Sequence, residues 1–108
     1  MRILIAEDEE RARRGLRSVL TSLSEDYEVV EASNGKQALE LLQILKPDVV
    51  FTDLKMPFLD GMGLIKAGIA AGVCTKYVIV SAYEEFEMAR QAISLGVKEY
   101  LVKPVTYD

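Results

Sequence analysis

The sequence predicts an α/β fold, a doubly wound sheet of five parallel strands with helices on both faces. Short apolar runs of strand length alternate with longer segments in which apolar residues recur at helical spacing. Five such runs and four such segments alternate strictly, without a linker or repeat between them. The chain has 108 residues, 50% of them apolar, which is enough for one domain with one core.

The first two strands are each followed by a helix. Residues 2–6 form an apolar run that ends abruptly in acid, which predicts a buried strand. Residues 27–32 form the second strand, and Asn34 is expected to cap the helix after it. Lys46-Pro47 ends that helix, since the residue before a proline avoids helical geometry. The helix expected from Glu9 onward has these apolar residues on one face: Ala12, Leu16, Val19, Leu20 and Leu23.

The third strand, residues 48–52, leads directly into Asp53. A loop containing Pro57 follows, and a helix is expected from about residue 60 to residue 71. Its glycines and alanines make it the weakest helix of the four. The remaining elements are strands at 77–81 and 98–102 and, between them, a helix at 84–94 that Gly96 ends, with Phe86, Ala89, Ala92 and Ile93 facing inward.

Composition excludes several classes of function. The net charge of -4 argues against direct nucleic-acid binding by this chain. Histidine is absent, which excludes Ser-His-Asp and Cys-His catalysis and any metal site with a histidine ligand. The single cysteine, Cys74, rules out an internal disulfide and suits a reducing compartment. No apolar run approaches the roughly 20 residues that cross a bilayer, so we expect a cytoplasmic protein with no membrane partner.

Polar side chains stand at the ends of four predicted strands. Glu7 and Asp8 follow the first strand, and Asp53 follows the third. Ser81 ends the fourth strand and Lys103 follows the fifth. Because the carboxyl ends of parallel strands meet at one edge of a doubly wound sheet, we expect these five residues to converge there.

Clustered carboxylates need a compensating charge, since two like charges about 4 Å apart repel by about 4 kcal/mol at an effective dielectric of 20. Oxygen ligands without histidine or cysteine favour Mg²⁺ over zinc or copper. Mg²⁺ commonly joins one or two carboxylates to a phosphate and neutralises phosphoryl oxygens during transfer. Asp53 is the best candidate for a nucleophile, because carboxylates form acyl phosphates and this one follows the central strand.

Four stretches of the chain resemble the response-regulator receiver domains of two-component signalling: ILIAEDE, VVFTDLKMPFLDG, VIVSA and EYLVKP. The resemblance covers essentially the whole chain, so residues 1–108 are expected to form one receiver domain. It implies a flavodoxin-like sheet with strand order 2-1-3-4-5. It also implies that Asp53 accepts a phosphoryl group from a phosphohistidine of a sensor histidine kinase. Such a domain is a signalling switch that shares in catalysing its own phosphorylation and dephosphorylation.

The resemblance implies a role for each site residue. Asp8 would ligate Mg²⁺ directly and Glu7 would do so directly or through water, with Asp53 and the backbone carbonyl of Lys55 as further ligands. Glu7 stands where aspartate is more usual in the family. Ser81 and Lys103 would contact the phosphoryl group, and Tyr100 would be an aromatic switch that moves with Ser81. Lys55 and Tyr83 resemble the positions that tune dephosphorylation in this family. The bond between Lys103 and Pro104 resembles the one that is frequently cis in this family.

The stretch YEEFEMARQAISLGVKEYLVKPV resembles receivers joined to AraC-type DNA-binding domains. Contact with DNA is therefore expected only through an output domain absent from these 108 residues, in the regulation of transcription. The chain stops at Asp108, where the family architecture places a fifth helix. We therefore expect a missing or truncated fifth helix, a partly open sheet face, and a homodimer or reduced stability.

Other interpretations remain open from the residues alone. Glu7 and Asp8 would also suit the positive end of the first helix. A pseudo-receiver, which docks partners without being phosphorylated, predicts the loss of a site residue, and none is lost. A phosphohydrolase with an aspartyl phosphate usually wants a second acid where Lys55 stands. A flavin-binding module wants a Ser/Thr/Gly-rich loop after the first strand, where the sequence is EDEERAR.

Overall fold

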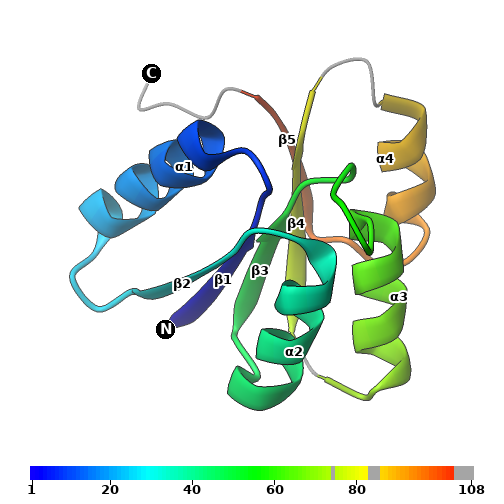
Figure 1. Cartoon of the computed structure of the whole chain (residues 1–108), viewed down its shortest axis with the longest axis horizontal. Helices are drawn as coiled ribbons and strands as arrows, with labels where there is room; N and C mark the ends of the chain where they lie inside the picture. The colour runs from blue at the N-terminus through cyan, green and yellow to red at the C-terminus, as the bar shows by residue number, and fades with distance from the viewer. Residues whose placement is uncertain (74, 83–85, 104–108) are drawn as a thin grey trace.

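The computed structural model describes residues 1–73, 75–82 and 86–103, which are coloured in Figure 1. The expectations for Cys74, Tyr83 and the Lys103-Pro104 bond lie outside the described residues. The inward positions expected for the side chains of Phe86 and Ala89 also lie outside them.

Strands and helices alternate over the described residues as the sequence predicts. They are β1 (Arg2–Ala6), α1 (Glu10–Leu23), β2 (Glu28–Ala32), α2 (Gly35–Leu45), β3 (Val49–Thr52), α3 (Gly61–Ala70), β4 (Lys76–Ser81), α4 (Phe86–Ile93) and β5 (Glu99–Val102). The strands form one parallel sheet in the order β2-β1-β3-β4-β5. The predicted doubly wound fold and its strand order are confirmed.

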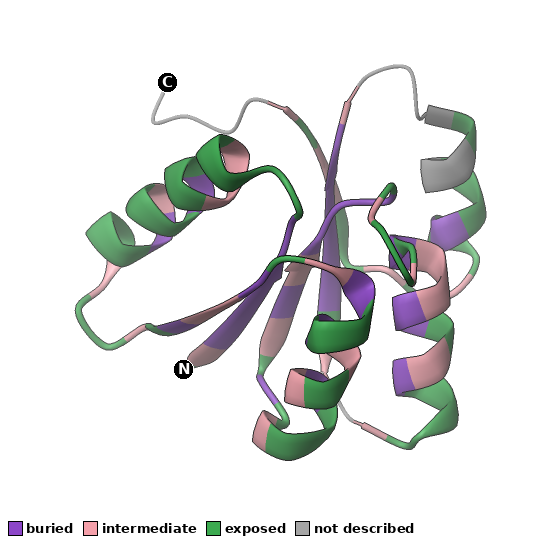
Figure 2. Cartoon of the chain, viewed as in Figure 1, coloured by how far each residue is buried: buried purple, intermediate pink, exposed green. Residues whose placement is uncertain are grey.

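Helices cover both faces of this sheet, with α1 on one side and α2, α3 and α4 on the other (Figure 1). Successive residues of a strand point to opposite faces, so β1 contributes to both cores. Leu4 packs toward α2 and α3, where it joins Leu42 and Leu64. Ile3 and Ile5 pack toward α1, in a cluster that also contains Leu16, Leu20, Val29 and Val80. The central strands are accordingly buried along much of their length (Figure 2).

Local chemistry sets the ends of several helices. Oδ1 of Asn34 accepts a hydrogen bond from the amide of Gln37 at 2.8 Å, which confirms Asn34 as a cap. Asp60 caps α3 in the same way, with its Oδ1 2.7 Å from the amide of Gly63. Lys46 leaves α2 with φ 47°, which fits the exclusion of helical geometry before Pro47. Gly96 has φ 86°, the left-handed conformation predicted after α4.

Two apolar side chains lie outside the cores to which the sequence assigned them. Ile93 was expected to face inward but is 60% exposed, whereas its neighbour Ala92 is fully buried. Consecutive helical residues point about 100° apart, and Ile93 lies on the side of α4 that its neighbours leave exposed. Leu23, in the last turn of α1, is 65% exposed, while Leu16 and Leu20 are buried. The spacing of apolar residues predicts the apolar face of each helix, but it does not predict which residues of that face the sheet covers.

The sheet face that carries α1 is partly open over the described residues. A cleft runs beside α1, with Ala12 and Leu16 on the helix side and Ile5, Phe51 and Val80 on the sheet side. Glu7 and Asp53 also line this cleft. Among the described helices, none is long and apolar enough to span a membrane.

Candidate functional site

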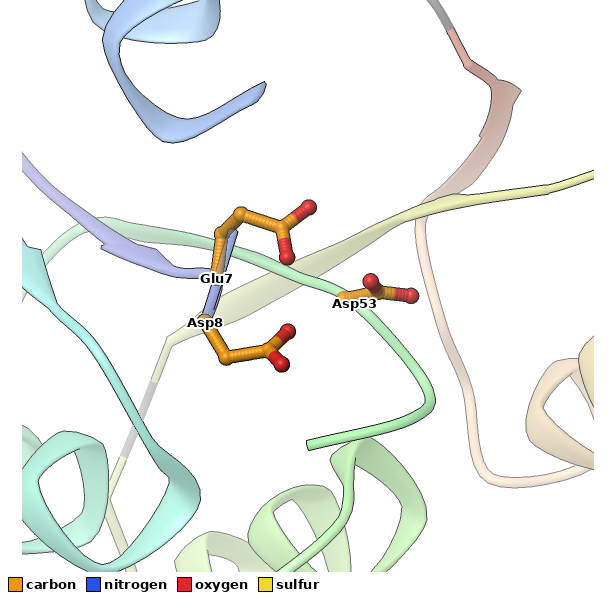
Figure 3. Close-up of side chains that lie close together, drawn as sticks. All are labelled: Glu7, Asp8 and Asp53. Carbon is orange, nitrogen blue, oxygen red and sulfur yellow. The ribbon is translucent and has the colours of Figure 1, made fainter. Parts of the chain in front are cut away.

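Three carboxylates meet at the carboxyl edge of the sheet. Glu7 and Asp8 directly follow β1, and Asp53 directly follows the neighbouring strand β3. Ala6 and Thr52 are partners in the ladder between these strands, so the next residue of each strand reaches the same level of the edge. Carboxylate oxygens of the three residues lie within 4.8 Å of one another, and Figure 3 shows the side chains gathered around a common space. Asp8 is exposed, whereas Glu7 and Asp53 are buried.

Asp53 is held at both carboxylate oxygens. Its Oδ1 accepts a hydrogen bond from the amide of Leu54 at 2.7 Å, and its Oδ2 accepts one from Nζ of Lys103 at 2.7 Å. Its backbone is packed against Gly61, where an added Cβ would lie 2.1 Å from the carbonyl oxygen of Asp53. These two hydrogen bonds and the backbone contact fix the orientation of the carboxylate. The side chain is 9% exposed.

Lys103 places one ammonium group between two of these acids. Its backbone amide continues the pairing of β5 with β4 by donating to the carbonyl of Ser81 at 2.9 Å. From there its Nζ contacts the carboxylates of both Asp53 and Glu7. Burial lowers the pKa of Lys103, but the hydrogen bonds to Asp53 and Glu7 outweigh this effect and raise it above the ordinary value. The group therefore stays charged at neutral pH.

Glu7 keeps its proton to a higher pH than an exposed glutamate does. Burial, which is the largest cause, and repulsion from Asp53 together raise the pKa of Glu7 to about 7, although the hydrogen bond from Lys103 opposes them. The amide of Glu9 also donates to its Oε2 at 3.2 Å. A bound cation would favour the ionised form of Glu7, because an opposite charge nearby lowers the pKa of a carboxyl group. The all-oxygen set of Glu7, Asp8 and Asp53 fits Mg²⁺.

Ser81 at the end of β4 and Tyr100 within β5 approach the same backbone carbonyl group. Ser81 is fully buried, and its hydroxyl lies 3.4 Å from the carbonyl oxygen of Ala82. The hydroxyl of Tyr100, which is half-buried, lies 3.4 Å from the same oxygen. The two residues expected to move together thus share one acceptor. Lys55 lies in the loop after Asp53 with an exposed side chain, and the ligand role of its carbonyl stays a prediction.

The sequence interpretation did not identify Arg13 as part of the site. Its Nη1 donates to the carbonyl of Glu7 at 2.9 Å, and its Nε donates to Oε1 of Glu31 in β2 at 3.0 Å. Arg17, one helical turn later, donates to Oε2 of Glu31 at 2.9 Å. The signal available in the sequence was the spacing of Arg13 and Arg17, which puts both on one side of α1, together with Glu31 near the end of the second strand.

The sequence profile of the response regulator receiver domain matches residues 3–108. The match includes every strand end that contributes to the site. The chain belongs to the response regulator receiver domain family.

Individual relatives of this receiver domain agree with that assignment. The chemotaxis protein CheY of Thermotoga maritima is 36% identical over 104 residues, which cover 95% of this chain and 85% of that protein. The uncharacterized transcriptional regulatory protein YesN of Bacillus subtilis is also 36% identical, over 95% of this chain. The receiver domain of AraT, a response regulator of Geobacillus stearothermophilus, has a TM-score of 0.89 and 39% identity, covering 97% of this chain and 82% of that one.

The receiver domain is a component of two-component signalling, and similar receivers form parts of larger regulators. The chain spans 28% of the length of YesN and 23% of the regulatory protein AtoC of Escherichia coli. The recognised family and the observed sheet agree with the resemblance found in the four sequence stretches.

Proposed function

We propose that Asp53 accepts a phosphoryl group from a phosphohistidine of a sensor histidine kinase, in a reaction that depends on Mg²⁺. The observation that carries this proposal is the position of the Lys103 ammonium, 2.7 Å from Oδ2 of Asp53 and in contact with Glu7. A buried carboxylate paired with a fixed cation, at the edge where Glu7 and Asp8 add further oxygens, suits nucleophilic attack on phosphorus.

In the proposed reaction a carboxylate oxygen of Asp53 forms a bond to phosphorus as the bond from phosphorus to the histidine nitrogen breaks. The imidazole leaves with that electron pair and the protein gains an acyl phosphate. Glu7, Asp8, Asp53 and the carbonyl of Lys55 would hold Mg²⁺, which supplies positive charge to the phosphoryl oxygens. Hydrolysis of the acyl phosphate returns the carboxylate. Because the same groups surround Asp53 in both reactions, the domain would share in catalysing its phosphorylation and its dephosphorylation.

The chain's own groups would orient and stabilise the phosphoryl group. The Leu54 amide already points at Oδ1 of Asp53 and restricts its rotation. The ammonium group of Lys103, which now pairs with Asp53 and Glu7, would also pair with a phosphoryl oxygen. The Ser81 hydroxyl would donate a hydrogen bond to another phosphoryl oxygen. Movement of Ser81 toward the phosphoryl group would release the carbonyl of Ala82 that it shares with Tyr100. Tyr100 would then turn inward and change the surface of α4 and β5.

The altered surface would control an output domain, and transcriptional regulation is the proposed output. Residues 83–105 resemble receivers joined to AraC-type DNA-binding domains, so DNA would be contacted by that output domain in the cytoplasm. The relative YesN, which is named as a transcriptional regulatory protein, supports this class of output.

Self-association is part of the proposal. Phe51 lines the cleft beside α1 and is only half-buried, and Leu101, which packs against the same apolar cluster, is also half-buried. A second copy would cover this surface. Light scattering across a concentration range tests the point, and a monodisperse monomer with normal cooperative melting would remove the homodimer from the proposal.

Intact-mass measurement tests the phosphorylation itself. The chain is incubated with Mg²⁺ and acetyl phosphate, and we expect it to gain the mass of one phosphoryl group. Asp53→Asn should abolish the gain, and Asp26→Asn, which changes an exposed aspartate in the turn after α1, should keep it. Chelation of Mg²⁺ should also abolish it.

The same mass measurement distinguishes this proposal from the alternative, a pseudo-receiver that docks partners without phosphorylation. No adduct at any Mg²⁺ concentration, or an adduct that survives Asp53→Asn, would reject the phosphoacceptor proposal. Beryllofluoride serves as the stable substitute for the phosphoryl group if the adduct is too short-lived to weigh.

A further inference from the structure

Phe58 is the most exposed large apolar side chain among the described residues, at 83% exposure. It lies in the loop between β3 and α3, which Figure 2 shows as largely exposed at its tip. Single exposed apolar side chains are common on protein surfaces, so exposure alone assigns no partner to Phe58. The backbone conformation of Phe58 is the additional observation.

The backbone at Phe58 is strained. Its φ is 70°, in the left-handed region that glycine and asparagine adopt readily and that a bulky residue rarely adopts. The amide of Leu59 donates to the carbonyl of Pro57 at 2.8 Å, which closes a γ-turn with Phe58 at its centre. A phenylalanine that is both exposed and strained costs stability without contributing to either core.

Both ends of the loop are fixed to the phosphorylation site. At one end the Leu54 amide holds Oδ1 of Asp53, and at the other Gly61 packs directly on the Asp53 carbonyl. The Gly61 amide also donates to the carbonyl of Leu54 at 2.8 Å, which closes the loop at its base. Phe58 thus stands on a loop whose base is Asp53 and its immediate neighbours.

The middle of the loop rests against the start of α2. The Gly35 amide donates to the Pro57 carbonyl at 3.4 Å, and a Cβ on Gly35 would lie 1.7 Å from the Leu59 carbonyl oxygen. A shallow groove separates the Phe58 ring from the first turns of α2, and its other lining residues are Asn34, Lys36, Gln37 and Glu40. An apolar ring beside a polar groove of mixed charge matches a protein surface that presents an apolar side chain among polar ones.

We propose that Phe58 is the aromatic contact by which this receiver recognises its protein phosphodonor, a protein that carries an apolar side chain beside its phosphohistidine. The inference rests on the proposed function and names a specificity residue for it. A protein that brings a phosphorylated side chain to Asp53 must cover the loop that begins at Asp53, whereas acetyl phosphate is small enough to reach the carboxylate without touching the ring. The strain at Phe58 keeps the ring pointing outward for that partner.

The test compares a small phosphodonor with a protein phosphodonor on the same variants. Phe58→Gly and Phe58→Asn remove the ring and suit the left-handed backbone, and Phe58→Tyr keeps the ring. Ile44→Ala, which removes another exposed apolar side chain from α2, is the matched control. The protein phosphodonor is the autophosphorylated cytoplasmic part of whichever sensor kinase of the source organism transfers fastest to the wild-type chain.

With acetyl phosphate we expect Phe58→Gly and Phe58→Asn to react within about twofold of the wild-type rate, as surface changes usually allow. With the kinase, kcat/KM for transfer should fall at least about tenfold in both variants, mainly through KM. Phe58→Tyr and Ile44→Ala should stay within about twofold in both assays. The urea midpoint of Phe58→Asn should be higher than that of the wild type, because asparagine adopts the left-handed backbone with less strain.

Three outcomes would overturn the proposal. Undiminished transfer from the kinase to Phe58→Gly, or no transfer from any kinase to a chain that acetyl phosphate labels, would exclude Phe58 as the donor contact. An equal loss with both phosphodonors would mean that the ring shapes the site instead. A change in sedimentation with unchanged transfer would assign the ring to a second copy of the chain. Failure of the proposed function is distinguishable, because acetyl phosphate would then label neither the wild type nor any variant.

Discussion

Nζ of Lys103 lies 2.7 Å from Oδ2 of Asp53, although 50 positions separate the two residues in the chain. The same ammonium contacts Glu7 at the end of β1. One cation from the last strand is therefore shared by acids from two other strands. This sharing makes the charge balance of the site depend on Lys103 more than on any other described residue.

Lys103→Met should slow phosphorylation by acetyl phosphate by about 10- to 100-fold, because a fixed positive charge beside the reacting oxygens is lost. It should also lower the free energy of unfolding by about 1–3 kcal/mol in Mg²⁺-free buffer, since two buried carboxylates lose their partner. Initial rates and urea unfolding measure both effects. Lys98→Met, at an exposed lysine before β5, is the matched control and should change neither.

Glu7 should make the stability of the metal-free protein decrease as the pH rises. Burial raises its pKa from the ordinary 4.5 to about 7, so between these values the folded chain holds a proton that the unfolded chain has released. Its stabilising contribution is complete below about pH 4.5 and is lost as the pH rises through 7. Glu7→Gln should remove this loss and be more stable than wild type at pH 8, on the order of 1–2 kcal/mol.

Urea unfolding at several pH values, with a chelator present, measures the effect of Glu7. The control is Glu25→Gln, at an exposed acid after α1, which should keep the wild-type pH profile. Added Mg²⁺ should raise the stability of the wild type at pH 8 more than that of Glu7→Gln. A wild-type profile that rises between pH 5 and 8 would contradict the assignment of the proton to Glu7.

Arg13→Ala should weaken Mg²⁺ binding by about 10-fold, because the bond from Arg13 to the Glu7 carbonyl positions a metal-ligating residue. The change should also cost about 1–2 kcal/mol of stability through the lost pair with Glu31. Mg²⁺ titration followed by calorimetry measures the affinity. Arg14→Ala removes a 73% exposed arginine on the same helix and should alter stability by less than about 0.5 kcal/mol. Equal affinities in the two variants would show that Arg13 has no positioning role.

Gly61→Ala should displace the backbone of Asp53. Its Cβ would lie 2.1 Å from the Asp53 carbonyl oxygen, so the backbone that carries the nucleophile must shift. We expect a loss of about 1–3 kcal/mol in stability and at least about a 10-fold slower phosphorylation. Gly15→Ala, where nothing lies within 4 Å of the added Cβ, should instead stabilise α1 by about 0.5–1 kcal/mol. Wild-type phosphorylation kinetics in Gly61→Ala would contradict the role of this contact.

The elements of the fold were predictable because their signals are local. The apolar run at residues 2–6 and the cap at Asn34 each depend on neighbours in the chain, and both match the structure. Parallel pairing then brings Glu7 and Asp53 to one edge, which follows from topology alone. The convergence of the acids could therefore be expected before any coordinate was known.

Contacts across the fold were less predictable. The exposure of Ile93 depends on how α4 lies on the sheet, and apolar spacing within the helix does not contain that angle. The bond from Arg13 to the Glu7 carbonyl needs the distance between α1 and the loop before it. The left-handed backbone of Phe58 needs the fixed positions of both loop ends, because phenylalanine does not favour it.

The sequence by itself determined which residues stand at the strand ends, and hence that Glu7, Asp8, Asp53, Ser81 and Lys103 share one edge. That information is local, since periodicity and turn residues decide where each strand stops. Only the tertiary structure decided how the charges are shared. The contact of Lys103 with two acids and the raised pKa of Glu7 depend on burial and on distances of a few ångströms between segments far apart in the chain.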